Sequence, residues 1–374
     1  MSDLAGNPYA SIVELSKAYR NKSVSPSEVT KAQLARIDDL DTKLGSYQTI
    51  YSDEALAAAK VADEAFTKDS RLGPFHGIPF ALKDIYELKG QITTCGSYEM
   101  QQRISVETGT VVRRLMDVGG IVIGKTKTVE CALGGWGTNE HMGTPWNPWD
   151  LEHPRVPGGS SSGSGVAVAS GLASCATGSD TGGSVRLPAA YCGLTGLKVS
   201  KACLPTDGIM PLSQTLDTPG PMTRNMPDLA LMFSVMKGID GRKIEIDMMN
   251  GDGLFNIQMN IFKGLKFGII DQKERSRCTE DILKSYDATL NLLVDLGAEL
   301  EVFTSPVAYD DMAQFNGAIT MYEGYHNHRH LYDNPSKIMD QNVKKRMLVG
   351  RDITPEKHAN LLSKRQDHQL IFKN

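Results

Sequence analysis

The sequence predicts an α/β fold, in which helices cover a sheet that has at least some parallel strands. Short apolar runs bounded by turn residues alternate with segments of helical periodicity along most of the chain, and this alternation is typical of parallel pairing. Of the 374 residues, 40% are apolar and 22% are charged. This is the composition of a protein that buries a full hydrophobic core.

The first expected elements are two helices and a strand. Residues 25–28 (Ser-Pro-Ser-Glu) form a capping box with proline at the first helical position, which predicts a helix to about Leu40. Residues 51–66 are rich in Ala, Glu and Lys and predict a second helix. Residues 77–82 are a short apolar run between turn residues and charged residues, so a buried strand is expected there. Lys83 then lies at a strand end, where the sites of α/β sheets gather.

The same alternation continues to the end of the chain. A helical pattern at residues 111–118 ends at two glycines and passes into an apolar strand at residues 121–123. The remaining expected elements are strands at 266–270 and 299–303, a helix between them at 282–296 that ends at Gly297, a turn and helix start at 333–336, and a helix at 355–372.

Composition and charge exclude several classes of partner. The formal net charge is −4, and no stripe of Lys and Arg alternates with aromatic residues, so nucleic acid is not an expected partner. No stretch approaches the roughly 18 apolar residues of a spanning helix, and the first ten residues do not resemble a signal peptide. A soluble cytoplasmic protein that does not bind membranes is expected. The six scattered cysteines are expected to be reduced and mostly buried.

A group of alternating histidines is a candidate metal site. His326, His328 and His330 would share one face of a strand, but the flanking residues favour a helix, in which alternating positions point apart. Neither a metal nor a cofactor is therefore expected.

Residues 158–165 form a loop rich in glycine and serine, followed by an apolar segment that predicts a short helix. A phosphate-binding loop requires a lysine at its end, and none follows here. The nucleophile elbow of α/β hydrolases requires a preceding strand, whereas residues 151–157 contain two prolines. From this segment alone, an ordinary surface loop remains an alternative interpretation.

Residues 178–188 point to a catalytic site. The small residues before Ser184 allow consecutive main-chain N–H groups to converge on one point, which an oxyanion hole requires. A helix start at Ser184 would add a partial positive charge beside that point. Ser184 is therefore a candidate nucleophile, and Asp180 and Arg186 are expected to form a structural ion pair.

These two segments together resemble the amidase signature family. Residues 158–164 read GGSSSGS, residues 178–188 read GSDTGGSVRLP, and Ser160 and Ser184 stand 24 positions apart, as the catalytic serines of that family do. The further matches are IPFALKD at 78–84, GKT at 124–126, NPWD at 147–150, LD at 216–217 and GPMTR at 220–224. The resemblance is dense over residues 70–225 and looser in the flanks to about residue 305.

The resemblance implies a single domain over residues 1–374 with the amidase signature fold, a mixed β-sheet core covered by α-helices, and a catalytic core at about residues 70–225. Family members usually continue into a further strand and helices, so the C-terminal part of the family fold is expected to be absent.

Residue roles follow from the same resemblance. It implies that Lys83 is the base, Ser160 the bridging serine after a cis peptide bond, and Ser184 the nucleophile. Backbone amides of Thr181, Gly182, Gly183 and Ser184 would form the oxyanion hole. A serine hydroxyl needs a base at neutral pH, and a lysine serves if burial lowers its pKa. Where the family has its acyl-side wall, this chain has Leu133, Gly134, Gly135 and Trp136, which suggests room for an aryl or other bulky substrate.

The expected function is hydrolysis of the C–N bond of a linear amide, outside peptide bonds, through an acyl-enzyme. An aryl amide, a carbamate or an ester is a further possible substrate. The expected partner is therefore a small-molecule amide or carbamate. A homodimer is a possible assembly. The alternatives are the glutaminase subunit of a tRNA-dependent amidotransferase and a non-catalytic scaffold that retains the fold.

Overall fold

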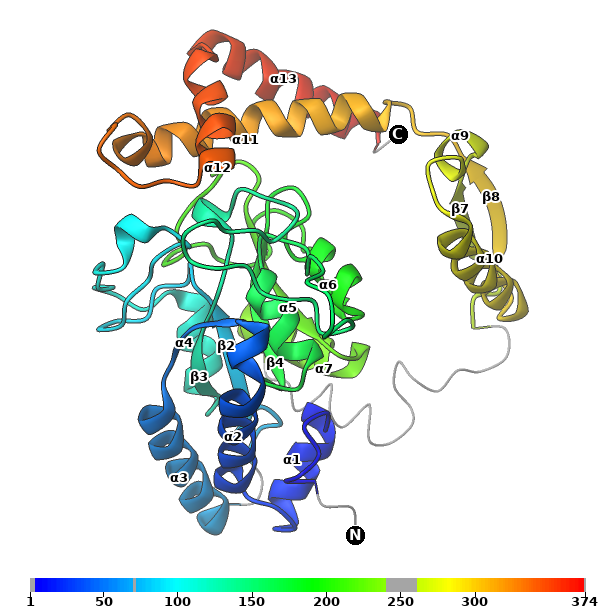
Figure 1. The fold of residues 1–374 in the computed structure, drawn as a ribbon. Helices are drawn as coiled ribbons and strands as arrows, with labels where there is room; N and C mark the ends of the chain where they lie inside the picture. The colour runs from blue at the N-terminus through cyan, green and yellow to red at the C-terminus, as the bar shows by residue number, and fades with distance from the viewer. Residues whose placement is uncertain (1–3, 70–71, 240–260, 373–374) are drawn as a thin grey trace. The chain divides into compact units, whose positions relative to one another are not determined.

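The computed structural model describes residues 4–69, 72–239 and 261–372, and these residues form two compact units. The first unit takes residues 4–69, 72–239 and 316–361. The second takes residues 261–315 and 362–372. Figure 1 shows the ribbon of both units, and the candidate catalytic residues all belong to the first.

The centre of the first unit is a mixed sheet. Among its described residues, six strands hydrogen-bond in the order β1-β3-β2-β4-β6-β5. Strand β2 is parallel to both β3 and β4, whereas the β1–β3, β4–β6 and β5–β6 pairs are antiparallel. The strands are β1 Tyr47–Ile50, β2 Pro79–Lys83, β3 Ile121–Thr126, β4 Cys175–Asp180, β5 Thr195–Gly196 and β6 Thr218–Thr223. The predicted α/β fold with a mixed sheet is confirmed.

Helices pack on this sheet and bury its apolar side chains (Figure 1). One core cluster joins Ile37 of α2, Ala81 of β2, Ile123 of β3 and Val166 of α5, all of which are almost fully buried. The helices of this unit are α1 Ile12–Arg20, α2 Pro26–Leu44, α3 Ser52–Lys68, α4 Thr110–Asp117, α5 Ser162–Ala169, α6 Arg186–Cys192, α7 Met226–Lys237 and α12 Gln341–Val349, with short 3₁₀ turns at Tyr98–Met100, Glu130–Ala132 and Gly350–Asp352. Two longer helices, α11 Tyr309–Tyr332 and α13 Pro355–Ile371, have residues in both units.

The predicted capping box at residues 25–28 is confirmed. The Ser25 side chain accepts from the Glu28 N–H, and the Glu28 carboxylate accepts from the Ser25 N–H. Helix α2 runs four residues beyond the expected end, to Leu44, and stops at Gly45, whose φ of 58° is left-handed. Glycine adopts this conformation without steric cost, so it ends the helix.

Two central strands were not predicted. Strand β4 lies in the Gly- and Ser-rich region, and β6 (TPGPMT) contains two prolines, which normally occur at sheet edges or bulges because they donate no hydrogen bond. Nevertheless, β6 lies between β4 and β5. The helix start expected at residues 333–336 is wrong: a turn is present there, but α12 begins at Gln341, where Asp340 accepts from two N–H groups of its first turn.

The second unit is built on the strands β7 Lys266–Ile270 and β8 Glu299–Phe303, which pair in parallel at the predicted positions. Helices α9 Gln272–Arg275 and α10 Glu280–Asp295 connect them. Helix α10 buries none of its residues. Across both units, none of the described helices combines the length and the apolar composition needed to cross a membrane.

Candidate active site

Lys83 occupies the last position of β2, and its side chain is fully buried. Its ammonium nitrogen Nζ lies 2.8 Å from Ser160 Oγ and 2.8 Å from Ser179 Oγ. Burial lowers the pKa of Lys83 to about 7, because the charged form loses its hydration. At neutral pH a substantial fraction of this amine is therefore uncharged and able to accept a proton.

Ser160 follows a cis peptide bond from Gly159, as the resemblance implied. The Ser160 carbonyl accepts from the Val129 N–H at 3.2 Å and from the Thr128 hydroxyl at 2.8 Å. The Gly159 N–H donates to the Gly135 carbonyl at 2.7 Å. These bonds place residues 128–135 against the loop of residues 158–165 and hold the Ser160 main chain in place.

The main chain of Ser184 lies beside the loop that carries Ser160. Its carbonyl accepts from the N–H of Ser161 at 3.3 Å, so the residue after Ser160 is bonded to it directly. Its side chain is nearly buried, with 9% of the residue exposed. The Ser184 hydroxyl donates no hydrogen bond to any other residue in the described part of the chain. The structure thus bonds the Lys83 and Ser160 side chains and places the Ser184 main chain beside Ser161.

The main chain between Thr181 and Gly183 forms the loop where the oxyanion hole was expected, hereafter the oxyanion loop. The fully buried carboxylate of Asp180 accepts from the N–H groups of Gly183 at 2.8 Å and Val185 at 3.2 Å. Of the four expected donors, the amide of Gly183 is therefore already engaged. Asn316 donates to the Thr181 carbonyl at 3.2 Å and orients the other end of the loop.

The predicted ion pair between Asp180 and Arg186 is confirmed, with Arg186 Nη2 2.9 Å from Asp180 Oδ1 and Nε 3.0 Å from Oδ2. Burial by itself raises the pKa of this carboxyl. The Arg186 guanidinium and the main-chain N–H donors more than offset that effect and bring the pKa below its ordinary value. Asp180 is therefore a negative charge that fixes the loop before Ser184.

The four residues expected to wall a substrate pocket differ in their burial and their contacts. Leu133 is buried, and its carbonyl accepts from Arg346 at 2.7 Å. Gly134 and Gly135 lie beside Gly159 and α6. Trp136 is 64% exposed, and its place in a substrate pocket stays a prediction.

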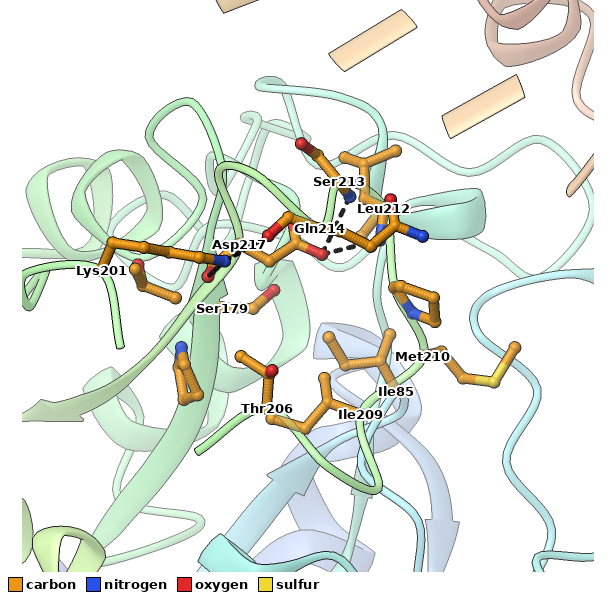
Figure 2. Close-up of a pocket in the computed structure, with 14 residues that line it drawn as sticks. Ile85, Ser179, Lys201, Thr206, Ile209, Met210, Leu212, Ser213, Gln214 and Asp217 are labelled. Carbon is orange, nitrogen blue, oxygen red and sulfur yellow. Dashed lines mark hydrogen bonds between the residues drawn. The ribbon is translucent and has the colours of Figure 1, made fainter. Parts of the chain in front are cut away.

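A small cavity of about 110 Å³ lies beside Ser179. Figure 2 shows Ser179 and Asp217 on one side of it and the apolar side chains of Ile85, Ile209 and Met210 on another. Ser179 Oγ is also hydrogen-bonded to Lys83 Nζ. One of the residues that line this cavity is therefore a direct partner of the buried amine. Neither Ser179 nor Asp217 was predicted as a functional residue, although both lie inside quoted motifs.

The alternating histidines lie on α11, as the helical pattern predicted. His328 bonds the Pro211 carbonyl at 2.8 Å, and His326 bonds the Tyr322 carbonyl one turn earlier at 2.8 Å. The described residues contain no group of three or more His, Cys, Asp or Glu that could hold a metal ion.

The first unit thus combines a mixed sheet with a buried lysine that is hydrogen-bonded to a serine after a cis peptide bond. The chain belongs to the amidase family, whose model matches residues 28–373. A glutamyl-tRNA(Gln) amidotransferase subunit of Geobacter metallireducens is 36% identical over 304 residues, which are 79% of this chain and 60% of that protein. The chain therefore spans less than two thirds of the length of this relative.

Solved structures agree with the family assignment. The crystal structure of an amidase superposes with a TM-score of 0.83 at 25% identity, covering 96% of this chain and 78% of the other. The native peptide amidase of Stenotrophomonas maltophilia gives a TM-score of 0.76 at 26% identity, covering 95% of this chain and 78% of the other. The predicted amidase signature fold is confirmed by these similarities.

Proposed function

We propose that this protein hydrolyses the C–N bond of an amide through an acyl-enzyme on Ser184, with Lys83 as the base and Ser160 as the proton relay. The observation that carries the proposal is the bond of 2.8 Å between a fully buried lysine amine and the Ser160 hydroxyl. A charged lysine in this position would lack most of its hydration, so the uncharged form, which accepts protons, is favoured.

The proposed reaction moves one proton along a row of three groups. Neutral Lys83 takes the proton of Ser160 while Ser160 takes the proton of Ser184, whose oxygen then attacks the carbonyl carbon. The N–H groups of Thr181, Gly182 and Ser184 are proposed to stabilise the oxyanion. The C–N bond breaks as Ser160 returns a proton to the departing amine. Water then hydrolyses the ester at Ser184 through the same relay.

Substitution of Lys83 tests the base. Lys83→Met keeps the apolar stem and removes the amine, so we expect reaction of Ser184 with a fluorophosphonate probe to slow by about 10²–10⁴-fold. The rate is measured by intact-protein mass spectrometry after timed exposure to the probe, with Ser184→Ala as the blank. Lys60→Met, at an exposed helix position, is the matched control. A Lys83→Met variant labelled at the wild-type rate would remove the base from the proposal.

A specific observation favours a second candidate function. The relative at 36% identity is named as one subunit of an amidotransferase, so glutamine is a candidate substrate and further subunits are candidate partners. The name of the peptide amidase likewise adds peptide amides to the candidates. Release of ammonia or amine from glutamine, a peptide amide, an anilide, a carbamate and an aliphatic amide, each compared with Ser184→Ala, separates these possibilities. A non-catalytic scaffold would react with neither the probe nor any of these substrates.

A further inference from the structure

Asp217 links the oxyanion loop to the wall of the cavity beside Ser179. It directly precedes Thr218, which pairs with Asp180 across the β4–β6 ladder. Its Oδ1 accepts from the Thr181 hydroxyl at 2.5 Å, and its Oδ2 accepts from the N–H groups of Leu212 at 2.8 Å and Ser213 at 2.9 Å. One carboxylate therefore holds two segments that are distant in sequence. Figure 2 shows its bonds to residues 212 and 213.

The cavity loop, residues 201–217, is also held from its other side. Lys201 Nζ donates to the Asp217 carbonyl at 3.1 Å. Glu323 of α11 accepts from the Thr215 N–H at 3.0 Å and bonds the Ser213 hydroxyl. Because the loop is fixed at these points, Asp217 presents its carboxylate to Thr181 from a rigid support.

We propose that Asp217 is a positioning residue for Ser184 chemistry, which holds Thr181 so that the oxyanion loop faces the substrate carbonyl. The inference rests on the proposed function of Ser184. Asp217 is linked to the oxyanion loop by its bond to the hydroxyl of Thr181, whose main chain begins the loop. Small displacements of such a loop lower reaction rates strongly, because its donors must lie within about 3 Å of the developing charge.

Asp217 also acts through its charge, which affects the pKa of Lys83 and can be tested separately from the bond to Thr181. The titratable groups whose charges act on Lys83 are Cys95, Asp217 and Asp180. The contact with Cys131 and burial raise the pKa of the Cys95 thiol well above its ordinary value, so this thiol is uncharged near neutral pH. The two carboxylates partly oppose the lowering of the Lys83 pKa by burial. Burial raises the pKa of Asp217 above its ordinary value, and the hydrogen bond from Thr181 and the charge of Lys201 partly offset that effect.

Four variants separate position from charge, with the labelling rate of Ser184 by a fluorophosphonate followed across pH. Thr181→Val removes the bond to Asp217 at nearly constant volume, and we expect a roughly tenfold slower reaction at an unchanged pH midpoint. Thr181→Ser keeps the hydroxyl and should retain the wild-type rate. Asp217→Asn should slow labelling and also move the midpoint to lower pH, because the neutral carboxamide no longer stabilises charged Lys83. Asp207→Asn, an exposed carboxylate of the same loop, should match wild type.

The outcomes are distinguishable. No labelling of the wild type overturns the proposed function itself. Labelled wild type with unchanged rates in both Thr181→Val and Asp217→Asn overturns the role of Asp217 alone, as does a Thr181→Ser variant as slow as Thr181→Val. If Asp217→Asn does not fold, the pair of Thr181 variants decides the question.

Discussion

At the scale of single residues, the site depends on buried charges whose partners are specific. Asp180 is fully buried, whereas the Arg186 side chain that pairs with it is 54% exposed. The guanidinium is therefore partly screened by water, but the carboxylate is not. Without the Arg186 side chain, the donors that the described residues offer to the Asp180 carboxylate are main-chain N–H groups.

We expect Arg186→Gln to lower the free energy of unfolding by about 1–2 kcal/mol near pH 7, after allowance for the exposure of the arginine. The folded-state pKa of Asp180 is below its ordinary value of 3.8, so this stabilisation is present above that value and is lost as pH falls through the folded-state pKa. Urea unfolding at several pH values measures it. Arg351→Gln, which removes an exposed ion pair, is the control. If the difference in the free energy of unfolding between wild type and Arg186→Gln grew on acidification, the stabilising role of the Asp180–Arg186 pair would be contradicted.

At the scale of elements, the close approach of two loops builds the site. A Cβ atom added at Gly159 would lie 2.6 Å from the Gly134 carbonyl oxygen and 2.6 Å from the Gly137 nitrogen. Both are main-chain atoms, so neither moves without displacing its loop. The glycine is required by this contact.

Gly159→Ala is therefore expected to destabilise the protein by about 1–3 kcal/mol or more, because the added methyl group overpacks a main-chain contact. It should also slow the labelling of Ser184, since the neighbouring Ser160 shifts. Gly73→Ala is the matched control, because nothing lies within 4 Å of the added atom. Equal unfolding midpoints for the two alanine variants would show that the loops do not pack as described.

Elements that are specified by a local sequence pattern were predictable from the sequence. The capping box at Ser25 and the apolar run before Lys83 depend on neighbours in the chain, and both are confirmed. Strand β6 was missed because its prolines contradict strand propensity, and the β4–β6 pairing outweighs that propensity. Ser179 was missed as a partner of Lys83 because it lies 96 positions away. No local pattern encodes a contact of that separation.

At the scale of the whole molecule, the two units differ in how much they bury. Every residue of β2 and of β4 is buried, whereas α10 buries none and β8 is mostly exposed. Local stability follows the number of buried apolar contacts. The second unit is therefore the less protected part of the described chain.

Hydrogen exchange followed by mass spectrometry tests this difference. We expect amides of α10, β7 and β8 to exchange at least about tenfold faster than those of β2 and β4 at the same pH and temperature. Peptides from α2, which is buried on one face, serve as the internal reference. Equal protection of the two strand pairs would contradict the description of the second unit as weakly buried.

The central claim concerns the protonation of Lys83, and the most direct measurement is its titration by NMR. With lysine labelled at ¹³Cε, the Lys83 resonance is assigned by its absence from Lys83→Met and followed as pH is raised. We predict a midpoint at about 7. A midpoint near the ordinary lysine value of 10.5 would mean that the amine is charged at neutral pH and cannot serve as the base.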